Sequence, residues 1–460
     1  MSNKLRTEKD LLGDIAIDDS GLWGAHTQRA IENFPIDAHR FHKDFIRAYA
    51  MVKRAAAMAN LENKAISEGI ANAIIQSCEE IESGKYHDQI VVNPLSGGAG
   101  TSINMNFNEV IANLANMKLG KKVGDYDPVH PLNTVNLHQS TNDTFPTATR
   151  IAALWMLERL EGYLTTLQAR LQDKEHEFAD IVTVARTQLQ DAVPVTMGQI
   201  FSTWGESTSR DRWRIFKCIE RLKIVNIGGT AVGTGIGATR KYIFKVIEIL
   251  RRFSGLPLTR ADNPVEATSN QDAIVEVSGI LSALATNLMK ISSDLRYMSS
   301  PPVGELELPA MQAGSSIMPG KVNPVIPEYV SQMALKAISH NNTLSHAIGM
   351  GNLQLSQFFP LAGWCLLDQL DGLSGAVKML YSKCIIDVDV NETRCQQNLE
   401  NSIAFASAMV PVIGYENVEK AVKLSKTTGM PIREALLDFG ATEDQIEKTL
   451  SPANLIKLGI

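Results

Sequence analysis

The sequence predicts an all-α fold, in which an elongated central bundle of long helices carries smaller N-terminal and C-terminal domains. Residues 148–182 and 197–224 each show a helix-like pattern with few breaks, and both runs exceed the length of a typical globular helix. The alternation of apolar and polar residues that marks a strand is nearly absent. Polar segments rich in Gly and Pro separate the helical runs, so we expect these segments to gather at the ends of the bundle.

The expected elements divide the chain into three parts. Residues 1–139 begin irregularly, with a polar cluster at 23–29 that is either functional or a surface loop, and continue as helices. Residues 140–394 hold the long helices, and residues 395–460 form a small helical domain. In chain order, the expected helices cover residues 45–60, 66–83, 106–119, 148–182, 197–224, 267–299, 328–348, 361–381, 418–427, 431–439 and 443–450.

Composition sets the class of protein. The chain has 460 residues, of which 44% are hydrophobic and 20% are charged, as is ordinary for a globular protein with a core of good size. The formal net charge is −6 and no block of Lys and Arg occurs, which argues against a nucleic-acid partner.

Cysteine usage and the N-terminus indicate a cytoplasmic protein. The five cysteines are scattered without a C-x-x-C pair, which favours reduced thiols over a disulfide framework or a zinc ribbon. The first residues lack the apolar core of a signal peptide, and we find no run of the length that a membrane span needs.

Two Gly-rich segments are candidates for ligand-binding loops. Residues 96–102 precede a predicted helix, where free backbone N–H groups favour an anion. A Walker phosphate loop requires Lys after the last Gly, but Thr101 stands there, so the segment does not match a phosphate loop. Two interpretations are left: the segment binds a carboxylate, or it is a flexible connector. Residues 228–237 have Gly-x-Gly-x-Gly spacing and follow an apparent helix, which does not favour a dinucleotide site.

Four polar loops, at residues 97–104, 139–143, 186–191 and 314–323, compete for the role of a site. Helix capping explains one or two polar residues in such a loop but not four in sequence, as in 140–143. The loops offer mostly neutral donors and one cation, which fits a small dianionic ligand because each carboxylate oxygen accepts two hydrogen bonds. The candidate residues are Thr101, Ser140, Thr141, Asn142, Thr187, Gln188, Ser315, Ser316, Lys321 and Asn323.

Other chemistries find less support. The chain has neither H-E-x-x-H nor G-x-S-x-G, so neither a zinc protease motif nor a hydrolase nucleophile is indicated. His340 and His346 are six residues apart, a spacing that a helix does not place on one face. The loop at 314–324 also fails the spacing of a phosphate loop. Ser315 could instead act as a base, if backbone N–H groups and Lys321 stabilise its alkoxide in a closed site.

The segment GSSIMPGKVNP at residues 314–324 resembles the motif of the aspartase/fumarase superfamily, and the resemblance extends over nearly the whole chain. Residues 98–104, 140–143, 186–191 and 322–328 are more similar to aspartate ammonia-lyases than to class II fumarate hydratases. The resemblance implies five long helices in each chain, a twenty-helix bundle in a homotetramer, and active sites shared by three subunits. It implies no organic cofactor and leaves open activation by a divalent metal such as Mg²⁺.

The resemblance also implies a reaction and a role for each candidate residue. The reaction is the reversible anti elimination of ammonia from L-aspartate to give fumarate through an aci-carboxylate carbanion, with Ser315 as the base on a loop that closes over the substrate. The implied contacts are Thr101, Ser140, Thr141 and Ser316 with the β-carboxylate, Thr187, Lys321 and Asn323 with the α-carboxylate, and Asn142 and Gln188 with the amine.

Three segments depart from the pattern of the superfamily: Phe107, residues 132–134 and residues 351–357. None of them touches the proposed base or the carboxylate loops, but they leave the substrate less certain than the reaction class. A class II fumarate hydratase and a lyase for an N-substituted aspartate therefore remain as alternatives. A non-enzymatic structural homologue is not favoured, because such a protein would have no need of the complete set of polar residues.

Overall fold

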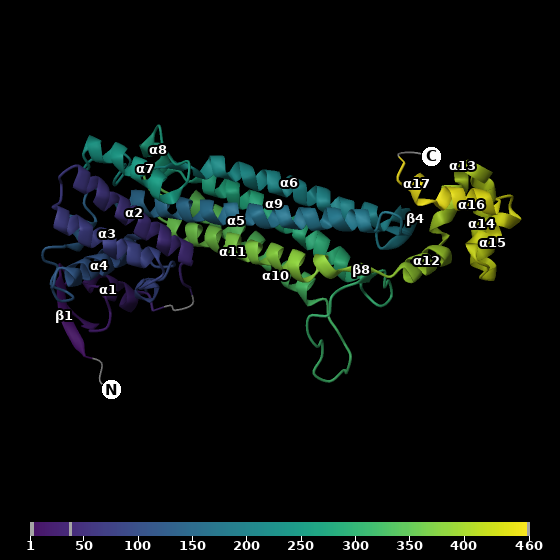
Figure 1. Cartoon of the computed structure of the whole chain (residues 1–460), viewed down its shortest axis with the longest axis horizontal. Helices are drawn as coiled ribbons and strands as arrows, with labels where there is room; N and C mark the ends of the chain where they lie inside the picture. Colours follow the sequence, from purple (N-terminus) through teal and green to yellow (C-terminus); the bar gives the residue numbers. More distant parts are fainter. Residues whose placement is uncertain (1–3, 36–38, 458–460) are drawn as a thin grey trace. The chain divides into compact units, whose positions relative to one another are not determined.

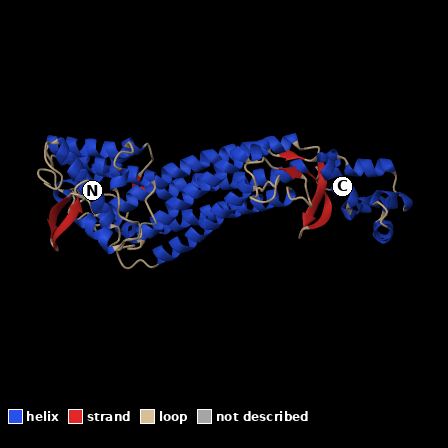
Figure 2. Ribbon diagram, turned by 90° about the horizontal axis from the view of Figure 1, so that it is seen from below, coloured by secondary structure: helices blue, strands red, loops and turns tan. Residues whose placement is uncertain are grey.

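The computed structural model describes residues 4–35 and 39–457, and helices make up most of this part of the chain (Figures 1 and 2). This result confirms the predicted all-α class. Within the described residues, five helices are at least 25 residues long, as expected from the sequence. They are α5 (Thr141–Glu177), α6 (Met197–Leu222), α9 (Asp272–Met298), α10 (Val325–Gly349) and α11 (Phe359–Lys383).

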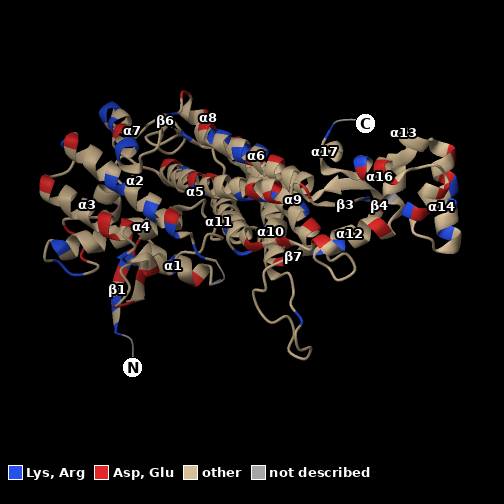
Figure 3. Ribbon diagram, turned by 45° about the vertical axis from the view of Figure 1, so that its right-hand side comes forward, with Lys and Arg blue, Asp and Glu red and all other residues tan. Residues whose placement is uncertain are grey.

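The long helices are stabilised by continuous apolar stripes. In α5, leucines recur every three or four residues and all of them are buried, so one face of the helix stays in the core along its length. They are Leu154, Leu157, Leu160, Leu164, Leu167 and Leu171. Figure 3 shows basic and acidic residues interspersed along the outer faces of the helices, without a block of one sign.

The other helices of the described residues are shorter. The helices outside the C-terminal part are α1 (Ala25–Asn33), α2 (Lys43–Glu62), α3 (Glu68–Glu82), α4 (Thr101–Lys118), α7 (Arg240–Ser254) and α8 (Pro264–Ser269). The later ones are α12 (Glu392–Asn401), α13 (Val410–Ile413), α14 (Tyr415–Thr428), α15 (Ile432–Asp438), α16 (Glu443–Leu450) and α17 (Pro452–Leu455). Single turns of other helix types are η1 (His87–Gln89), η2 (Pro131–Val135), η3 (Ile385–Asp387) and η4 (Ile403–Met409).

The strands of the described residues pair in two-stranded sheets. Three sheets are antiparallel and the sheet of β5 and β6 is parallel. The pairs are β1 (Leu5–Asp10) with β2 (Gly13–Asp18), β3 (Val182–Thr187) with β4 (Gln190–Thr196), β5 (Ile224–Val225) with β6 (Thr259–Arg260), and β7 (Leu306–Glu307) with β8 (Asp389–Val390).

The irregular start expected for the first forty residues is wrong. Residues 5–18 form the β1–β2 hairpin, and the polar cluster at 23–29 enters helix α1. The sequence of β1, LRTEKD, is almost entirely polar, so it lacks the alternation by which a strand is recognised. The helix expected over residues 267–299 is also divided, because α8 ends at Ser269 and α9 begins at Asp272.

The chain separates into two compact units. Unit 1 comprises the described residues of Met1–Leu160, Arg214–Ser282 and Lys336–Gly372, and unit 2 those of Glu161–Trp213, Ala283–Leu335 and Leu373–Ile460. The three-part division at residues 139 and 394 stays a prediction.

Helix α9 has the length and apolar composition of a membrane span, contrary to the expectation that no run has them. In its most apolar 18-residue window, 44% of the residues are buried inside the structure. Leu281, Leu284 and Leu288 are among them, so these apolar residues serve the protein core.

Buried aromatic rings pack the N-terminal parts of α4 and α5 against α2 in unit 1. The rings of Tyr49 on α2 and Phe107 on α4 stack with centroids 4.3 Å apart, and Phe145 on α5 lies 5.1 Å from Phe45. All four side chains are buried. Phe107, which departs from the expected smaller residue, therefore fills the core directly behind the loops that precede these two helices.

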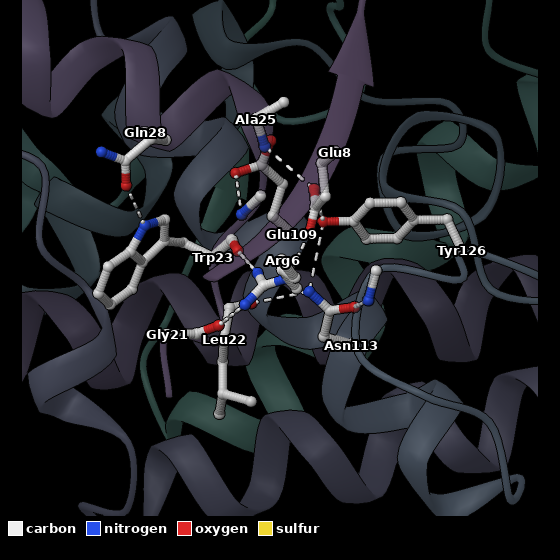
Figure 4. Close-up of polar contacts among 12 residues, drawn as sticks. Arg6, Glu8, Gly21, Leu22, Trp23, Ala25, Gln28, Glu109, Asn113 and Tyr126 are labelled. Atoms are coloured by element: carbon white, nitrogen blue, oxygen red, sulfur yellow. Dashed lines mark hydrogen bonds and ion pairs between the residues drawn. The ribbon is translucent and has the colours of Figure 1, made fainter. Parts of the chain in front are cut away.

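Two buried carboxylates hold the N-terminus of α1 (Figure 4). Glu109 on α4 accepts hydrogen bonds from the backbone N–H groups of Gly24 at 2.8 Å, His26 at 3.0 Å and Thr27 at 3.2 Å. Glu8 on β1 accepts from the N–H of Ala25 at 3.2 Å. Negative charge is favourable at a helix N-terminus, so these contacts fix α1 against α4.

Burial raises the pKa of the Glu109 carboxyl from 4.5 to about 7, while the backbone N–H groups act in the opposite direction. A carboxyl whose pKa is raised on folding contributes stability at low pH and loses it as the pH rises through the folded value. Relative to Glu109→Gln, the unfolding free energy of the wild type should fall by roughly 2 kcal/mol between about pH 5 and about pH 8. Urea denaturation at a series of pH values measures this difference.

Glu32→Gln is the control, because it removes an exposed carboxylate from α1, the helix whose N-terminus Glu109 holds. It should show no such change with pH. If the unfolding free energy of the wild type instead rises with pH relative to that of Glu109→Gln, the raised pKa of Glu109 is contradicted.

Candidate active site

The loop that carries Ser315 lies between β7 and α10 and is closed at its neck (Figure 1). The N–H of Gly314 donates to the carbonyl of Lys321 at 2.7 Å, and the Asn323 side-chain amide donates to the carbonyl of Gly314 at 2.9 Å. An antiparallel bridge joins Ala313 and Val322. Beyond this neck, Ile317 is 84% exposed, so the tip of the loop is available for contact with a ligand or another chain.

The Ser315 hydroxyl sits among backbone donors. Its Oγ accepts hydrogen bonds from the N–H of Ile317 at 3.2 Å and the N–H of Met318 at 3.0 Å. Such donors favour the charged form of an oxygen acid, so they stabilise a serine alkoxide. Backbone N–H groups are one of the two interactions that the sequence led us to expect for stabilising the Ser315 alkoxide. The other candidate, Lys321, is exposed in the same loop, as is Ser316.

The candidates Thr187 and Gln188 lie at the tip of the β3–β4 hairpin. Thr187 pairs with Gln190, so Gln188 and Leu189 form a two-residue turn. Both turn residues have left-handed backbone conformations, with φ values of 54° and 60°. Turns of this kind favour Asn or Gly, and a bulky residue there carries strain of a sort that is concentrated at functional sites.

Thr101 is the first residue of α4 and follows a left-handed segment. Gly98, Ala99 and Gly100 all have positive φ, which turns the chain sharply into the helix. The Thr101 hydroxyl is exposed at the helix N-terminus, where an anion is favoured. A Cβ on Gly100 would lie 3.5 Å from the Thr141 methyl group, so the loop before α4 packs closely on the start of α5.

The candidates at the start of α5 are organised by Asp143. Its carboxylate accepts from the N–H of Ser140 at 3.0 Å, of Gly228 at 3.1 Å and of Thr230 at 2.9 Å. Burial raises the pKa of this carboxyl to about 6, and these donors oppose the shift. The Gly-rich segment 228–237 thus serves to hold the Ser140–Asn142 loop.

Lys53 on α2 is a buried ammonium beneath the same loops. It donates to the side-chain oxygens of Asn104 at 2.7 Å, Asn136 at 3.1 Å and Gln139 at 3.0 Å. Asn104 lies on the first turn of α4, so Lys53 joins the supports of the Thr101 and Ser140 loops. Burial lowers the pKa of Lys53 to about 7, and the Asp143 carboxylate opposes this shift.

The candidate residues divide between the two units. Thr141 and Asn142 line one small pocket of unit 1 with Ala99, close to Thr101 and Ser140. The remaining six candidates belong to unit 2, on the hairpin and the Ser315 loop. Lys53 and Asp143 were not predicted as supports, since the sequence shows only a lone Lys in an Ala-rich helix and an Asp at a helix start. Across the described ranges, no cluster of three or more His, Cys, Asp or Glu residues is arranged to hold a metal ion.

Comparison with known proteins finds relatives along nearly the whole chain. A lyase family model matches residues 13–339, and a model of the fumarase C C-terminus matches residues 406–457. The aspartate ammonia-lyase of Bacillus subtilis is 42% identical over 459 residues, which cover 99% of this chain and 97% of that protein. The aspartate ammonia-lyase of Escherichia coli is 40% identical, with coverage of 99% and 97%.

Solved structures agree with these sequence relatives. A fumarate lyase:delta crystallin from Brucella melitensis, bound to cobalt, has a TM-score of 0.93 at 40% identity and covers 99% of this chain and 100% of its own. A class II fumarase from Schistosoma mansoni has a TM-score of 0.90 at 29% identity, with 98% of both chains covered.

The neck of the Ser315 loop yields a direct test. A Cβ on Gly314 would lie 2.8 Å from the carbonyl oxygen of Lys321 and 2.9 Å from the backbone nitrogen of Asn323, both of them main-chain atoms. Gly314→Ala should therefore open the neck, since such overpacking costs on the order of 1–3 kcal/mol. Hydrogen exchange of the amides at 314, 317 and 318 should become at least about tenfold faster.

Global thermal unfolding should change little, because the loop is largely exposed. Gly69→Ala on α3 serves as the control, since a Cβ there meets no atom within 4 Å. Unchanged exchange in Gly314→Ala would show that the neck does not hold the loop.

Proposed function

Since the chain belongs to the aspartase/fumarase superfamily and is a carbon–nitrogen lyase, we propose that it is an aspartate ammonia-lyase, which converts L-aspartate reversibly to fumarate and ammonia. The observation that carries the proposal is the Ser315 hydroxyl, which accepts two backbone hydrogen bonds in a loop built for that geometry. The aspartate ammonia-lyases at about 40% identity over nearly the full chain support the substrate.

In this proposal, Ser315 acts as its alkoxide and removes the proton from the carbon next to the β-carboxylate. The electron pair of the broken C–H bond delocalises into that carboxylate, which becomes a doubly charged aci form. The pair then forms the carbon–carbon double bond while the C–N bond breaks and its electrons leave with ammonia. The first step is the harder one, because charge accumulates on one carboxylate.

The candidate residues divide among the three charged groups of the substrate. Hydroxyl donors stabilise the developing charge on the β-carboxylate, while a cation and an amide bind the α-carboxylate. An ammonium group needs acceptors, which the side-chain oxygens of two amides supply. In order, these residues are Thr101, Ser140, Thr141 and Ser316 for the β-carboxylate, Thr187, Lys321 and Asn323 for the α-carboxylate, and Asn142 and Gln188 for the amine.

We propose that the site is completed in a homotetramer, with three subunits contributing to each site. Large apolar side chains are exposed on the long helices, such as Phe216 on α6 and Leu335 and Ile338 on α10. Exposed apolar residues of this kind mark association surfaces. We further propose that the enzyme is cytoplasmic, needs no organic cofactor, and binds neither nucleic acid nor a membrane. Assays with and without Mg²⁺ test whether a divalent metal activates it.

A substrate panel tests the reaction. Purified protein should form fumarate, detected by its ultraviolet absorbance, from L-aspartate and far more slowly from L-malate or N-substituted aspartates. The physical reason is that Asn142 and Gln188 present acceptors to an ammonium group. Turnover of malate alone would replace the proposal with fumarate hydratase, and preference for an N-substituted aspartate would reassign the substrate.

Ser315→Ala is the matched control for this panel. The variant should lose at least about 1,000-fold in turnover, because removal of the base leaves only binding and electrostatic effects. Its assembly should match that of the wild type, since the loop is exposed. An active Ser315→Ala variant would exclude this serine as the base.

A further inference from the structure

We propose that Arg186 and Glu305 form a positioning pair that holds the amine-binding hairpin in place on unit 2. The inference rests on the proposed function and assigns a role to two residues outside the set of substrate contacts. Both residues lie in unit 2.

The pair is a bidentate ion pair around a buried carboxylate. Nη1 and Nη2 of Arg186 donate to the two oxygens of Glu305 at 2.9 Å and 2.8 Å. The Glu305 side chain is 0% exposed, and its Oε1 also accepts from the Asn398 amide at 2.8 Å. The Glu305 hydrogen bond raises the pKa of the Arg186 guanidinium, which keeps it charged. Fork geometry of this type fixes orientation as well as distance.

On one side, the pair anchors the turn that carries Gln188. Arg186 lies opposite Asp191 in the β3–β4 hairpin, one rung before the pair of Thr187 and Gln190. The turn beyond that rung is strained, because Gln188 and Leu189 are both left-handed. A strained two-residue turn keeps its shape only where the surrounding structure holds its base.

On the other side, Glu305 is the root of the Ser315 loop. Its N–H donates to the carbonyl of Met298 at the end of α9, and its carbonyl accepts from the N–H of Asn391, both at 3.0 Å. The next two residues form β7, which pairs with β8, and the chain then runs on to Ser315. The main chain of Glu305 is thus fixed by hydrogen bonds at the loop root, and its side chain is hydrogen-bonded to Arg186 of the hairpin.

This geometry makes a specific kinetic prediction. If Glu305 loses its charge, Arg186 keeps Asp191 at 3.5 Å as its ion-pair partner within the hairpin, but its bond to the loop root is weakened. The hairpin that presents Thr187 and Gln188 then shifts. A displacement of about 1 Å costs on the order of 100-fold in rate. Because Gln188 is the amine contact, the Michaelis constant for ammonia in the reverse reaction should rise more than that for fumarate.

The experiment compares Glu305→Gln, Arg186→Lys and the double variant with the wild type in both directions of the reaction. Each single variant should lower kcat/KM for L-aspartate by about 100-fold. The double variant should be little worse than either single variant, because both changes break the same contact. Arg186→Lys keeps the charge without the fork, and it carries the test if Glu305→Gln does not fold.

Arg433→Lys and Glu443→Gln are the matched controls. Arg433 and Glu443 also form an Arg–Glu pair in unit 2, at 3.0 Å and 2.6 Å, but on the exposed surface of α15 and α16. Both controls should retain wild-type kinetics.

A purely structural role would lower the amount of active enzyme and leave both Michaelis constants unchanged, and that result would overturn the proposal. So would additive effects in the double variant. Wild type is assayed with L-aspartate and L-malate alongside. If the wild type reacts only with malate, the proposed substrate is wrong. If Glu305→Gln has the same kcat/KM as the wild type on whichever substrate reacts, the positioning role of the pair is wrong.

Discussion

Buried charged groups hold the loops of the candidate site in conformations that the loops would not keep alone. Lys53 and Asp143 support the Thr101 and Ser140 loops, and Glu305 anchors the hairpin of Gln188. An unpaired buried charge costs several kcal/mol, so each of these groups specifies one arrangement of its partners. The hydroxyls and amides of these loops are therefore placed by charges that the substrate does not need to touch.

The long helices were predictable because their apolar residues repeat over many turns, as the buried leucines of α5 show. The Ser315 loop was predictable because Gly, Pro and hydroxyl residues seldom gather between helices. The supports could not be predicted in the same way. Glu305 and Arg186 are 119 residues apart, and nothing near either one reveals its partner. The β1–β2 hairpin was missed because the residues of β1 are almost entirely polar and lack the alternation that reveals a strand.

The division of the candidates between two units bears on how the site is built. Thr101 and Ser140–Asn142 lie in unit 1, at the starts of α4 and α5, whereas the hairpin of Gln188 and the loop of Ser315 lie in unit 2. A reaction that builds charge on one carboxylate needs both sets at once. Assembly of chains, as proposed for the homotetramer, would then be a condition for catalysis.

Subunit mixing tests this central claim most directly. Thr101→Val and Ser315→Ala lie in different units, and each variant should be inactive by itself. If different chains contribute the two residues to one site, the co-refolded variants should recover fumarate formation from L-aspartate, because some sites then contain both wild-type residues. Ser315→Ala mixed with Ser316→Ala, which changes the same loop, should recover none. No recovery in the first mixture, with tetramers formed, would contradict a site shared between subunits.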